Sequence, residues 1–348
     1  MKRNMLGTSD LSVSEICLGS MTWGTQNSVE EGHAQIDRAL ERGVNFIDTA
    51  EMYPTTPLSR ETCTDTEEII GQWVEKTGRR DEVVIATKVV GKGFGFLRNG
   101  EPISPEIIEG ALEGSRRRLR CDTIDLYQLH WPNRGHFHFR RAWEYDPSGQ
   151  DRQEVVDDLR RTLECLARKV EKGDIRHVGV SNDTTWGMMK MLEIAKAEGF
   201  PRIVSVQNEY SLLYRQFDLD LAEFAHHEQV GLLSYSPLAA GLLSGKYSGD
   251  VTPKGSRRDV SSENLGGRMN PTSLAATDDY VALAREHGLD PVQMALAFCI
   301  SRPFMASTII GATTMGQLDN ALDAADLTLS DAVMDGIAAL HRKWPAPY

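Results

Sequence analysis

Short apolar runs alternate with longer amphipathic segments along almost the whole chain. The runs are rich in Val and Ile and stop at polar or Gly-containing turns, as buried strands do, while the longer segments repeat apolar residues with a helical period. We expect strands at Ile16–Gly19, Asn45–Ile47, Val83–Thr87, Thr123–Leu129, Ile175–Val180, Ile203–Val206, Gly231–Tyr235 and Ser307–Ile310. We expect helices at Glu30–Arg42, Thr66–Thr77, Pro105–Arg120, Gln153–Lys172, Trp186–Glu198, Asp218–His227 and in a final set from Asp278 onward.

This order of elements predicts an α/β fold, a single (β/α)8 TIM barrel. Strands that lack polar alternation and are each followed by a helix indicate a parallel sheet buried on both faces, and about eight strand–helix units close such a barrel. Residues 1–15 are typical of a small hairpin with its turn at Gly7–Asp10, which would cover the barrel floor. No linker, low-complexity tract or charge block divides the chain, so we expect one domain over residues 1–348.

Two connections are longer than barrel closure requires. Pro132–Arg152 and Leu238–Thr277 each follow a strand, so we expect them at the C-terminal face, where loops shape the active site of a barrel. The first connection carries Phe137, Phe139, Trp143 and Tyr145. With Trp23, these rings indicate a largely apolar mouth suited to aldehydes, although they could equally pack the loop against the barrel.

Composition and charge remove several classes of protein from consideration. The chain has 348 residues, 41% hydrophobic and 25% charged, which excludes disordered and fibrous classes. Its net charge of -12 and pI near 5.3 oppose binding to nucleic acid and to anionic lipid surfaces. Five scattered cysteines without a C-x-x-C pair argue against a disulfide framework. Because neither a signal peptide nor an apolar run of about 20 residues is present, we expect a cytoplasmic protein. The sequence does not indicate whether the protein forms oligomers.

Ionisable side chains terminate three consecutive predicted strands. The second strand ends in Asp48, with Tyr53 five residues later, the third ends in Lys88, and the fourth ends in His130. Because neighbouring parallel strands lie about 4.8 Å apart, groups at their carboxyl ends converge on one mouth of a barrel. Four convergent titratable groups indicate a catalytic site.

Each of these residues taken alone has a simpler interpretation. Asp48 could cap a turn or a helix, Tyr53 could serve packing, and His130 could be a hydrogen-bonded core histidine. A lysine in the position of Lys88 needs a partner, and a salt bridge with Asp48 could merely close the barrel end. The joint placement of all four favours catalysis over these separate roles.

Carbonyl reduction is the chemistry that needs this set. Hydride arriving at a carbonyl carbon builds negative charge on the oxygen, which a nearby acid must protonate. Tyr53 can be that acid, because a tyrosine with an ordinary pKa of about 10 is protonated at neutral pH. Lys88 would stabilise the phenolate, Asp48 would hold the lysine charged and oriented, and His130 would direct an N–H group at the substrate oxygen.

These four residues lie in the order and local context of the catalytic tetrad of the aldo-keto reductase superfamily, which the chain resembles. The resemblance extends from LSVSEICLGSMTWG near the start to GATTMGQLDNAL near the end, specifically to the branch of bacterial Tas-like proteins and potassium-channel β subunits. It implies NADPH-dependent reduction of an aldehyde or ketone to an alcohol, with Tyr53 as proton donor. It also implies that the small-molecule carbonyl substrate contacts Trp23, Tyr53, His130 and Trp131.

Ordinary dinucleotide-binding fingerprints are absent from the chain. The glycine-rich stretch Gly91–Gly95 precedes a turn rather than the helix that such a fingerprint requires. Gly179–Asp183 lacks the final glycine of the nucleophile elbow of serine hydrolases, so that enzyme class is not expected either. The resemblance implies instead that Ser181, Asn182 and Gln207 hold the nicotinamide amide, although the first two could equally form a turn. The further cofactor contacts that it implies are Trp23, Tyr235 on the nicotinamide face, and Ser236, Leu238, Gly241 and Lys246 along the pyrophosphate.

The segment IIGATTMGQLDNAL, after the last predicted strand, is suited to the adenosine end of the cofactor. Free amides at a helix start, supported by the helix dipole, bind phosphate, so we expect Gly311 and Thr313 to meet the 2′-phosphate. Gln317 and Asn320, one helical turn apart, could reach the adenine.

Two features bear on the form of the cofactor. Arg257 is a further candidate phosphate contact, although Arg258 could take its place, or both arginines could simply be solvated. Better-known members of the superfamily carry Lys at the Gly311 position and Arg at the Gln317 position. This chain lacks that pair, and so does the channel β-subunit branch that it resembles. We therefore expect NADP rather than NAD.

Other functions remain open on the residues alone. Lys88 could form a Schiff base, as in barrel aldolases, but the segments that resemble a cofactor site would then have no dinucleotide to bind. The resemblance to channel β subunits raises another alternative, a redox-sensing or regulatory protein that holds NADPH and turns over slowly. His136-x-His138 and His226-His227 lack Cys or carboxylate partners at ligand spacing, so we expect no metal site.

Overall fold

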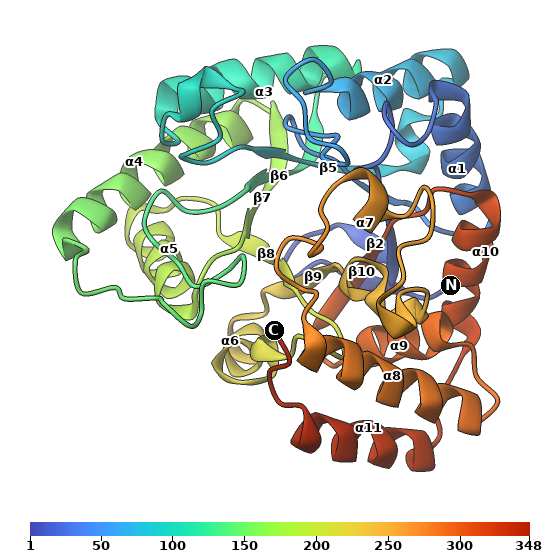
Figure 1. Ribbon diagram of the computed structural model, residues 1–348. Coiled ribbons are helices and arrows are strands. Elements are labelled where there is room, and N and C mark those ends of the chain that lie inside the picture. Colours follow the sequence, from blue (N-terminus) through green and yellow to red (C-terminus); the bar gives the residue numbers. More distant parts are fainter.

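Eight parallel strands form a closed barrel in the computed structural model, which describes residues 1–348 (Figure 1). The barrel strands are β3 (Ile16–Gly19), β4 (Phe46–Asp48), β5 (Val84–Val89), β6 (Ile124–Leu129), β7 (Ile175–Ser181), β8 (Ile203–Glu209), β9 (Gly231–Tyr235) and β10 (Met305–Ile310). The ring closes where β10 pairs with β3. This arrangement is the predicted (β/α)8 barrel, and every predicted strand overlaps an observed one.

Helices cover the outer surface of the barrel, as Figure 1 shows. The helices that alternate with the strands are α1 (Val29–Glu41), α2 (Asp65–Thr77), α3 (Pro105–Leu119), α4 (Arg152–Glu171), α5 (Thr185–Glu198), α6 (Asp220–Glu228), α9 (Pro291–Ile300) and α10 (Met315–Asp323). Three others, α7 (Arg257–Val260), α8 (Pro271–Glu286) and α11 (Asp331–Lys343), lie outside this alternation. None of the helices combines the length and the apolar character that a membrane span requires.

The sequence-based start of the last helices at Asp278 is wrong, because α8 begins at Pro271. Asn270 caps this helix by accepting from the backbone N–H of Ser273, whose hydroxyl accepts in return from the backbone of Asn270. Proline at the first helical position also favours the start. The connection predicted at Leu238–Thr277 is therefore shorter, and it contains α7 and short 3-10 turns.

Two strands continue at least two residues further toward the barrel mouth than their sequences predict. β5 runs to Val89 rather than Thr87, and β8 runs to Glu209 rather than Val206. Polar residues stay within these strands because parallel neighbours on both sides pair with them in register. The sheet itself, rather than a loop, therefore positions Lys88 and Glu209.

The N-terminal hairpin covers the barrel floor, as predicted. β1 (Arg3–Met5) pairs antiparallel with β2 (Ser12–Ser14), and the apolar residues Leu6, Leu11 and Val13 join the cluster that fills the floor end of the barrel. Gly7 has a φ of 57°, and a Cβ atom there would lie 2.2 Å from the carbonyl oxygen of Val204. Only glycine permits this close approach of the hairpin to β8.

The barrel interior changes from apolar at the floor to polar at the mouth. Side chains two positions apart on a strand point to the same side of the sheet. In three consecutive strands an inward apolar residue is followed by a buried polar one: Phe46 then Asp48, Ala86 then Lys88, and Leu126 then Gln128. This change creates a layer of polar groups just below the mouth.

Candidate active site

Asp48 and Lys88 form a buried ion pair below the barrel mouth. Nζ of Lys88 donates to Oδ2 of Asp48 at 2.7 Å and to the carbonyl oxygen of Thr49 at 2.7 Å. The two side chains are 4% and 0% exposed, respectively. Burial alone would lower the pKa of Lys88, but the charge of Asp48 and the hydroxyl of Tyr53 together raise that pKa above its ordinary value. The lysine is therefore an ammonium at neutral pH.

Tyr53 lies next to this ion pair, on the loop that follows β4. Nζ of Lys88 is 4.9 Å from the centroid of the Tyr53 ring, and the ring of His130 meets it edge-on at 5.8 Å. Burial raises the pKa of Tyr53 above its ordinary value, and the ammonium of Lys88 opposes that rise. The phenol is therefore protonated at neutral pH, with a cation beside it that stabilises the phenolate once the proton leaves.

His130 directly follows β6 and is a neutral imidazole. Burial, with a smaller contribution from the charge of Lys88, lowers the pKa of His130 well below its ordinary value. Its Nδ1 atom has no hydrogen-bond partner, and its backbone carbonyl accepts from the side-chain amide of Asn182 at 3.0 Å. The structure therefore brings all four residues of the expected tetrad to the same mouth.

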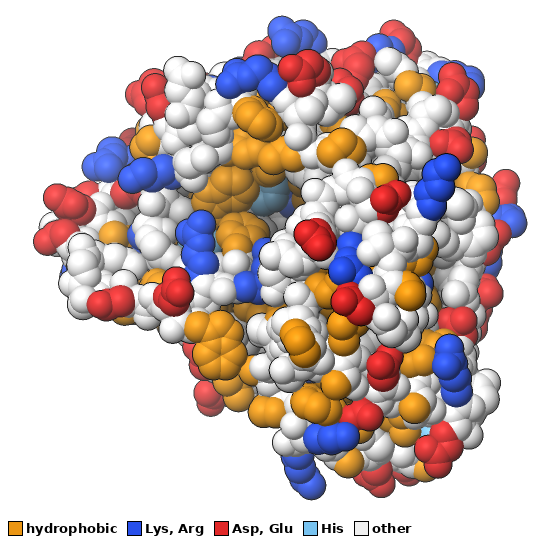
Figure 2. Space-filling view, in the orientation of Figure 1, with side chains coloured by type: hydrophobic (Ala, Val, Ile, Leu, Met, Phe, Trp, Pro, Cys, Tyr) orange, Lys and Arg blue, Asp and Glu red, His pale blue; other side chains and the backbone are white.

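Aromatic side chains stand beside the tetrad. Figure 2 shows a hollow with a histidine side chain at its bottom and hydrophobic side chains around it. Trp131 packs against His130 with ring centroids 5.0 Å apart, and Phe139 meets Trp131 edge-on at 5.9 Å. The indole N–H of Trp131 donates to the carbonyl of Lys92 at 3.0 Å. We call Trp131 and Phe139 the aromatic wall.

The other aromatic candidates do not join this wall. Trp23 is fully buried, and its indole N–H donates to Gln35 of α1 at 3.0 Å. Trp143 is 73% exposed. Phe137 and Tyr145 pack against each other with ring centroids 6.0 Å apart. Packing of the loop, the alternative that the sequence left open, accounts for these last two rings.

His136 and His138 stabilise the same loop. Their ring centroids lie 5.8 Å apart, and Nε2 of His138 lies 2.9 Å from the carbonyl oxygen of Asp183. Burial lowers the pKa of His136 to about 4, so its imidazole is neutral at physiological pH. No group of three or more His, Cys, Asp or Glu side chains in the structure is arranged to hold a metal ion.

Polar side chains at the ends of β7, β8 and β9 form a connected cluster beside Asp48. Nε2 of Gln207 donates to Oδ1 of Asp48 at 2.8 Å, and the hydroxyl of Ser181 donates to the carbonyl of Gln207 at 2.7 Å. The hydroxyl of Tyr235 donates to Oδ1 of Asn182 at 2.7 Å. Four residues expected near a nicotinamide therefore lie together, and Gln207 connects them to the tetrad.

The residues expected along the pyrophosphate follow β9. Leu238 precedes the 3-10 turn Ala239–Ser244, and Ser236 and Gly241 have φ values of 54° and 96°. A Cβ atom on Gly241 would lie 2.9 Å from Cε of Lys246, so these two residues are in contact. These residues form a tight turn with an exposed lysine at the mouth.

The residues expected at the adenosine end follow β10. Gly311 is exposed, and the backbone N–H and the hydroxyl of Thr313 both donate to Oε1 of Gln317 at 3.0 Å. Asn320 instead hydrogen-bonds to Gln293 of α9 at 2.7 Å. The start of α10 thus holds three of the four expected residues in one exposed group, whereas Asn320 is engaged with the neighbouring helix.

The structure distinguishes the two arginines that the sequence left equivalent. Arg258 donates to the carbonyls of Asp250, Val251 and Glu263, and it pairs with the Asp250 carboxylate at 2.8 Å. Arg257 makes no ion pair, and its guanidinium lies 3.9 Å from Sδ of Met21. Burial lowers the pKa of Arg257 to about 10. A half-buried guanidinium without a carboxylate partner is suited to an anionic ligand.

The sequence did not reveal a set of buried carboxylates that form ion pairs with arginines in the loops around the barrel mouth. These ion pairs are Arg98 with Glu51, Arg134 with Asp183, and Arg140 and Arg268 with Glu209. Each acid ends a barrel strand or follows it by a few residues, which is a signal that sequence inspection could have used. The arginine partners carry no such signal, because they lie in irregular loops.

Comparisons with known proteins cover almost the whole chain. A model of the aldo/keto reductase family matches residues 15–342. Protein tas of Escherichia coli is 43% identical over 357 residues, with 100% of both chains covered. A probable voltage-gated potassium channel subunit beta of Oryza sativa is 28% identical, with 99% of this chain and 98% of the relative covered. The chloroplastic pyridoxal reductase of Arabidopsis thaliana is 30% identical, with 84% and 74% covered.

Proposed function

Because this chain belongs to the aldo/keto reductase family of oxidoreductases, we propose that it reduces aldehydes or ketones to alcohols with NADPH as hydride donor. The observation that carries this proposal is the buried ion pair of Lys88 and Asp48 beside the hydroxyl-bearing ring of Tyr53. An ion pair that only stabilised the barrel would not require a partly exposed phenol and a neutral imidazole next to it.

Tyr53 acts as the general acid in this proposal. Its hydroxyl transfers a proton to the carbonyl oxygen of the substrate as negative charge develops there, and the O–H bond of the phenol breaks. The ammonium of Lys88 stabilises the resulting phenolate, while Asp48 keeps Lys88 charged and fixed. His130, a neutral imidazole, orients the carbonyl by hydrogen bonding.

The residues around the tetrad fit a nicotinamide dinucleotide. When bound, that cofactor supplies the hydride. Oε1 of Gln207 and the side chains of Ser181 and Asn182 would hold the carboxamide, and the ring of Tyr235 would lie against the nicotinamide face. Arg257, half-buried and without an ion-pair partner, supplies a positive charge for a phosphate in a protein whose net charge is -12.

The form of the cofactor rests on the start of α10. The exposed backbone at Gly311 precedes a helix of nine residues capped by Thr314, and a positively polarised helix start of this kind suits a 2′-phosphate. We therefore propose NADPH over NADH. Gln317, already bonded to Thr313, would contact the adenine edge, with Asn320 one turn further along the same helix.

The substrate we propose is an aldehyde or ketone with an apolar, preferably aromatic, body. The aromatic wall of Trp131 and Phe139 lies next to His130, where the body of the substrate would rest while its oxygen faces Tyr53.

All five cysteines are unpaired, which agrees with the reducing cytoplasm in which we place the enzyme.

A redox-sensing protein is the second candidate, favoured by the similarity to a potassium channel subunit beta. Such a protein would hold NADPH, complete a single slow turnover and then stop. One assay separates the two functions. An activated aldehyde such as a nitrobenzaldehyde is supplied in excess, and the absorbance of the reduced cofactor is recorded to measure its consumption, first with NADPH and then with NADH. We expect many turnovers per protein molecule with NADPH. A single turnover would favour the sensor, and no NADPH consumption would refute the reductase.

A further inference from the structure

Glu209 connects two mouth loops that are far apart in the sequence. It is the last residue of β8, 2% exposed, and pairs in register with Tyr235 of β9. Its Oε2 atom accepts from Arg140 at 3.0 Å, and its two oxygens accept from Arg268 at 2.6 and 2.9 Å. The hydroxyl of Tyr348 adds a longer hydrogen bond to Oε1 at 3.2 Å. A single carboxylate therefore fastens three segments at the mouth.

The contact with Arg140 supports the aromatic wall. Phe139 and Arg140 have φ values of 59° and 64°, so two consecutive non-glycine residues occupy the left-handed region. A conformation of this kind persists only when surrounding contacts hold it in place. The ion pair of Arg140 with Glu209 is such a contact, and the turn that it holds directs the ring of Phe139 onto Trp131, beside His130.

The contact with Arg268 supports the cofactor side. Arg268 is buried, and besides Glu209 its guanidinium contacts the hydroxyl of Ser236 at 3.4 Å and the carbonyl of Leu265 at 3.1 Å. Ser236 follows β9 at the place where the proposed function puts the cofactor. The same loop carries Arg257, whose pKa is lowered mainly by burial and also by the charge of Arg268.

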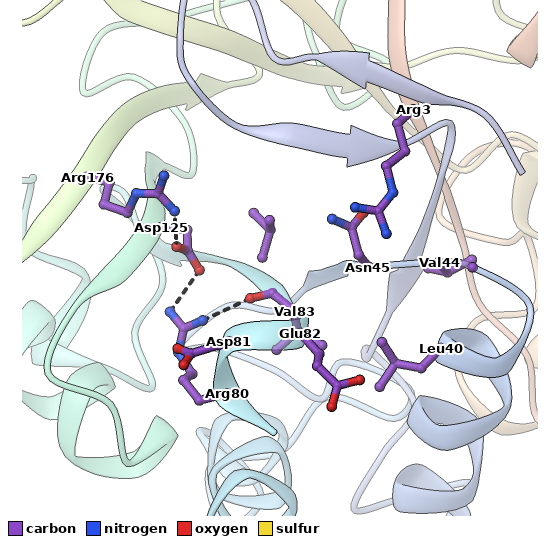
Figure 3. Close-up of a pocket in the computed structure, with 12 residues that line it drawn as sticks. Arg3, Leu40, Val44, Asn45, Arg80, Asp81, Glu82, Val83, Asp125 and Arg176 are labelled. Carbon is purple, nitrogen blue, oxygen red and sulfur yellow. Dashed lines mark hydrogen bonds and ion pairs between the residues drawn. The ribbon is translucent and has the colours of Figure 1, made fainter. Parts of the chain in front are cut away.

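The opposite end of the barrel provides a comparison. Figure 3 shows Asp125 between Arg80 and Arg176, in a cavity of about 430 Å³ at the barrel floor. Asp125 is 5% exposed, and these arginines donate to it at 2.7 and 2.8 Å. The chemistry matches that of Glu209, one buried carboxylate with two arginines, but this cluster contacts neither the tetrad nor the aromatic wall. Asp125 therefore represents the purely structural role.

We propose that Glu209 is a positioning residue for the reaction, which sets the aromatic wall through Arg140 and the cofactor segment through Arg268 at the same time. This inference rests on the proposed function. It predicts that substrate recognition and cofactor retention depend on the same carboxylate, although Glu209 touches neither ligand. Aromatic substrates depend on it more than small aliphatic ones, because only they use the wall.

The test compares Glu209→Gln, Glu209→Asp and Asp125→Asn with the wild-type protein. We measure kcat and KM for a nitrobenzaldehyde and for propanal, and the NADPH dissociation constant by fluorescence without substrate. For Glu209→Gln we expect the ratio of kcat/KM between the aromatic and the small aldehyde to fall about tenfold, mainly through KM, and NADPH to bind about tenfold more weakly. Glu209→Asp restores part of both losses.

Asp125→Asn separates positioning from general destabilisation. It lowers thermal stability by a similar amount but leaves the aldehyde ratio and the NADPH dissociation constant at wild-type values. Equal effects of Glu209→Gln and Asp125→Asn, or a wild-type ratio in Glu209→Gln, overturn the inference while the reductase assignment stands. If the wild-type protein binds NADPH without turnover, equal NADPH affinity of wild type and Glu209→Gln overturns it. A wild-type protein that does not bind NADPH refutes the proposed function and this inference together.

Discussion

Lys88 and Asp48 neutralise each other in the interior of the barrel, with Nζ of the lysine 2.7 Å from Oδ2 of the aspartate and almost no solvent contact for either side chain. A buried ion pair of this kind is a poor source of stability, because the loss of hydration roughly cancels the attraction between the charges. Breaking it is nevertheless costly, since the remaining charge has no partner. Removing one charge of the pair should therefore lower both stability and activity, whereas removing both charges should lower activity alone.

Lys88→Met tests this separation. We expect turnover to be lost and the free energy of unfolding to fall by about 3–5 kcal/mol, because Asp48 would remain buried with only Gln207 donating to it. The double variant Lys88→Met/Asp48→Asn removes both charges, so it should regain most of the stability and none of the turnover. Chemical denaturation and the NADPH assay measure the two properties. Recovery of activity in the double variant would show that the pair is structural.

Tyr53→Phe should lower kcat by about 100-fold or more and leave NADPH affinity unchanged, because only the proton donor is lost. Tyr127→Phe is the matched control. Tyr127 lies in β6, fully buried, and its hydroxyl has no hydrogen-bond partner, so removing that hydroxyl should leave turnover near the wild-type rate. Steady-state kinetics and NADPH fluorescence decide. Wild-type turnover in Tyr53→Phe would refute the proposed acid.

Acid pH should destabilise the protein through His136. Burial lowers the pKa of this histidine from 6.5 to about 4 in the folded state. The unfolded chain therefore takes up a proton between these pH values while the folded protein does not, so the stabilising effect is complete above pH 6.5 and is lost as the pH falls toward 4. His136→Gln should lose less stability over this window than the wild type. The control His227→Gln, at an exposed position on α6, should keep the wild-type slope of unfolding free energy against pH.

The sequence predicted the architecture and the tetrad because both depend on local signals. An ionisable residue at or just after the end of a strand specifies where Asp48 and His130 lie, and parallel pairing then brings them together. The pairs that shape the mouth depend on contacts between distant residues instead. Glu209 and Arg268 are separated by 59 positions, and nothing in the irregular loop around Arg268 indicates its partner. The sequence also placed Trp23 at the mouth, but its ring is fully buried and its N–H donates to Gln35. This contact depends on how α1 packs against the barrel, which the residues around Trp23 do not indicate.

Gly91→Ala should weaken the binding of aromatic aldehydes. A Cβ atom at Gly91 would lie 2.4 Å from Cδ1 and Nε1 of Trp131 and 2.8 Å from its carbonyl oxygen, so the indole must leave its present position beside His130. We expect KM for a nitrobenzaldehyde to rise about tenfold with a smaller change for propanal. Gly95→Ala, in the same loop, has no atom within 4 Å of the added Cβ and serves as control. Equal KM values for the two variants would place Trp131 outside the substrate site.

Arg257→Ala should weaken cofactor binding, and the structure indicates which part of the cofactor is affected. The guanidinium of Arg257 lies 3.9 Å from Sδ of Met21, in the loop after β3, and its positive charge opposes the rise that burial causes in the pKa of Tyr53. We therefore expect Arg257 to contact the pyrophosphate, which NADPH and NADH share. Its removal should weaken both by about tenfold, the scale of one charge-assisted hydrogen bond.

Lys254→Ala provides the charge-matched control for this experiment, because Lys254 is an exposed cation in the same loop. Fluorescence titration of each variant with both cofactors gives four dissociation constants to compare with the wild type. A loss confined to NADPH in Arg257→Ala would assign the guanidinium to the 2′-phosphate instead. A loss of equal size in Lys254→Ala would show that the effect comes from the overall positive charge of the loop and not from a direct contact of Arg257 with the cofactor.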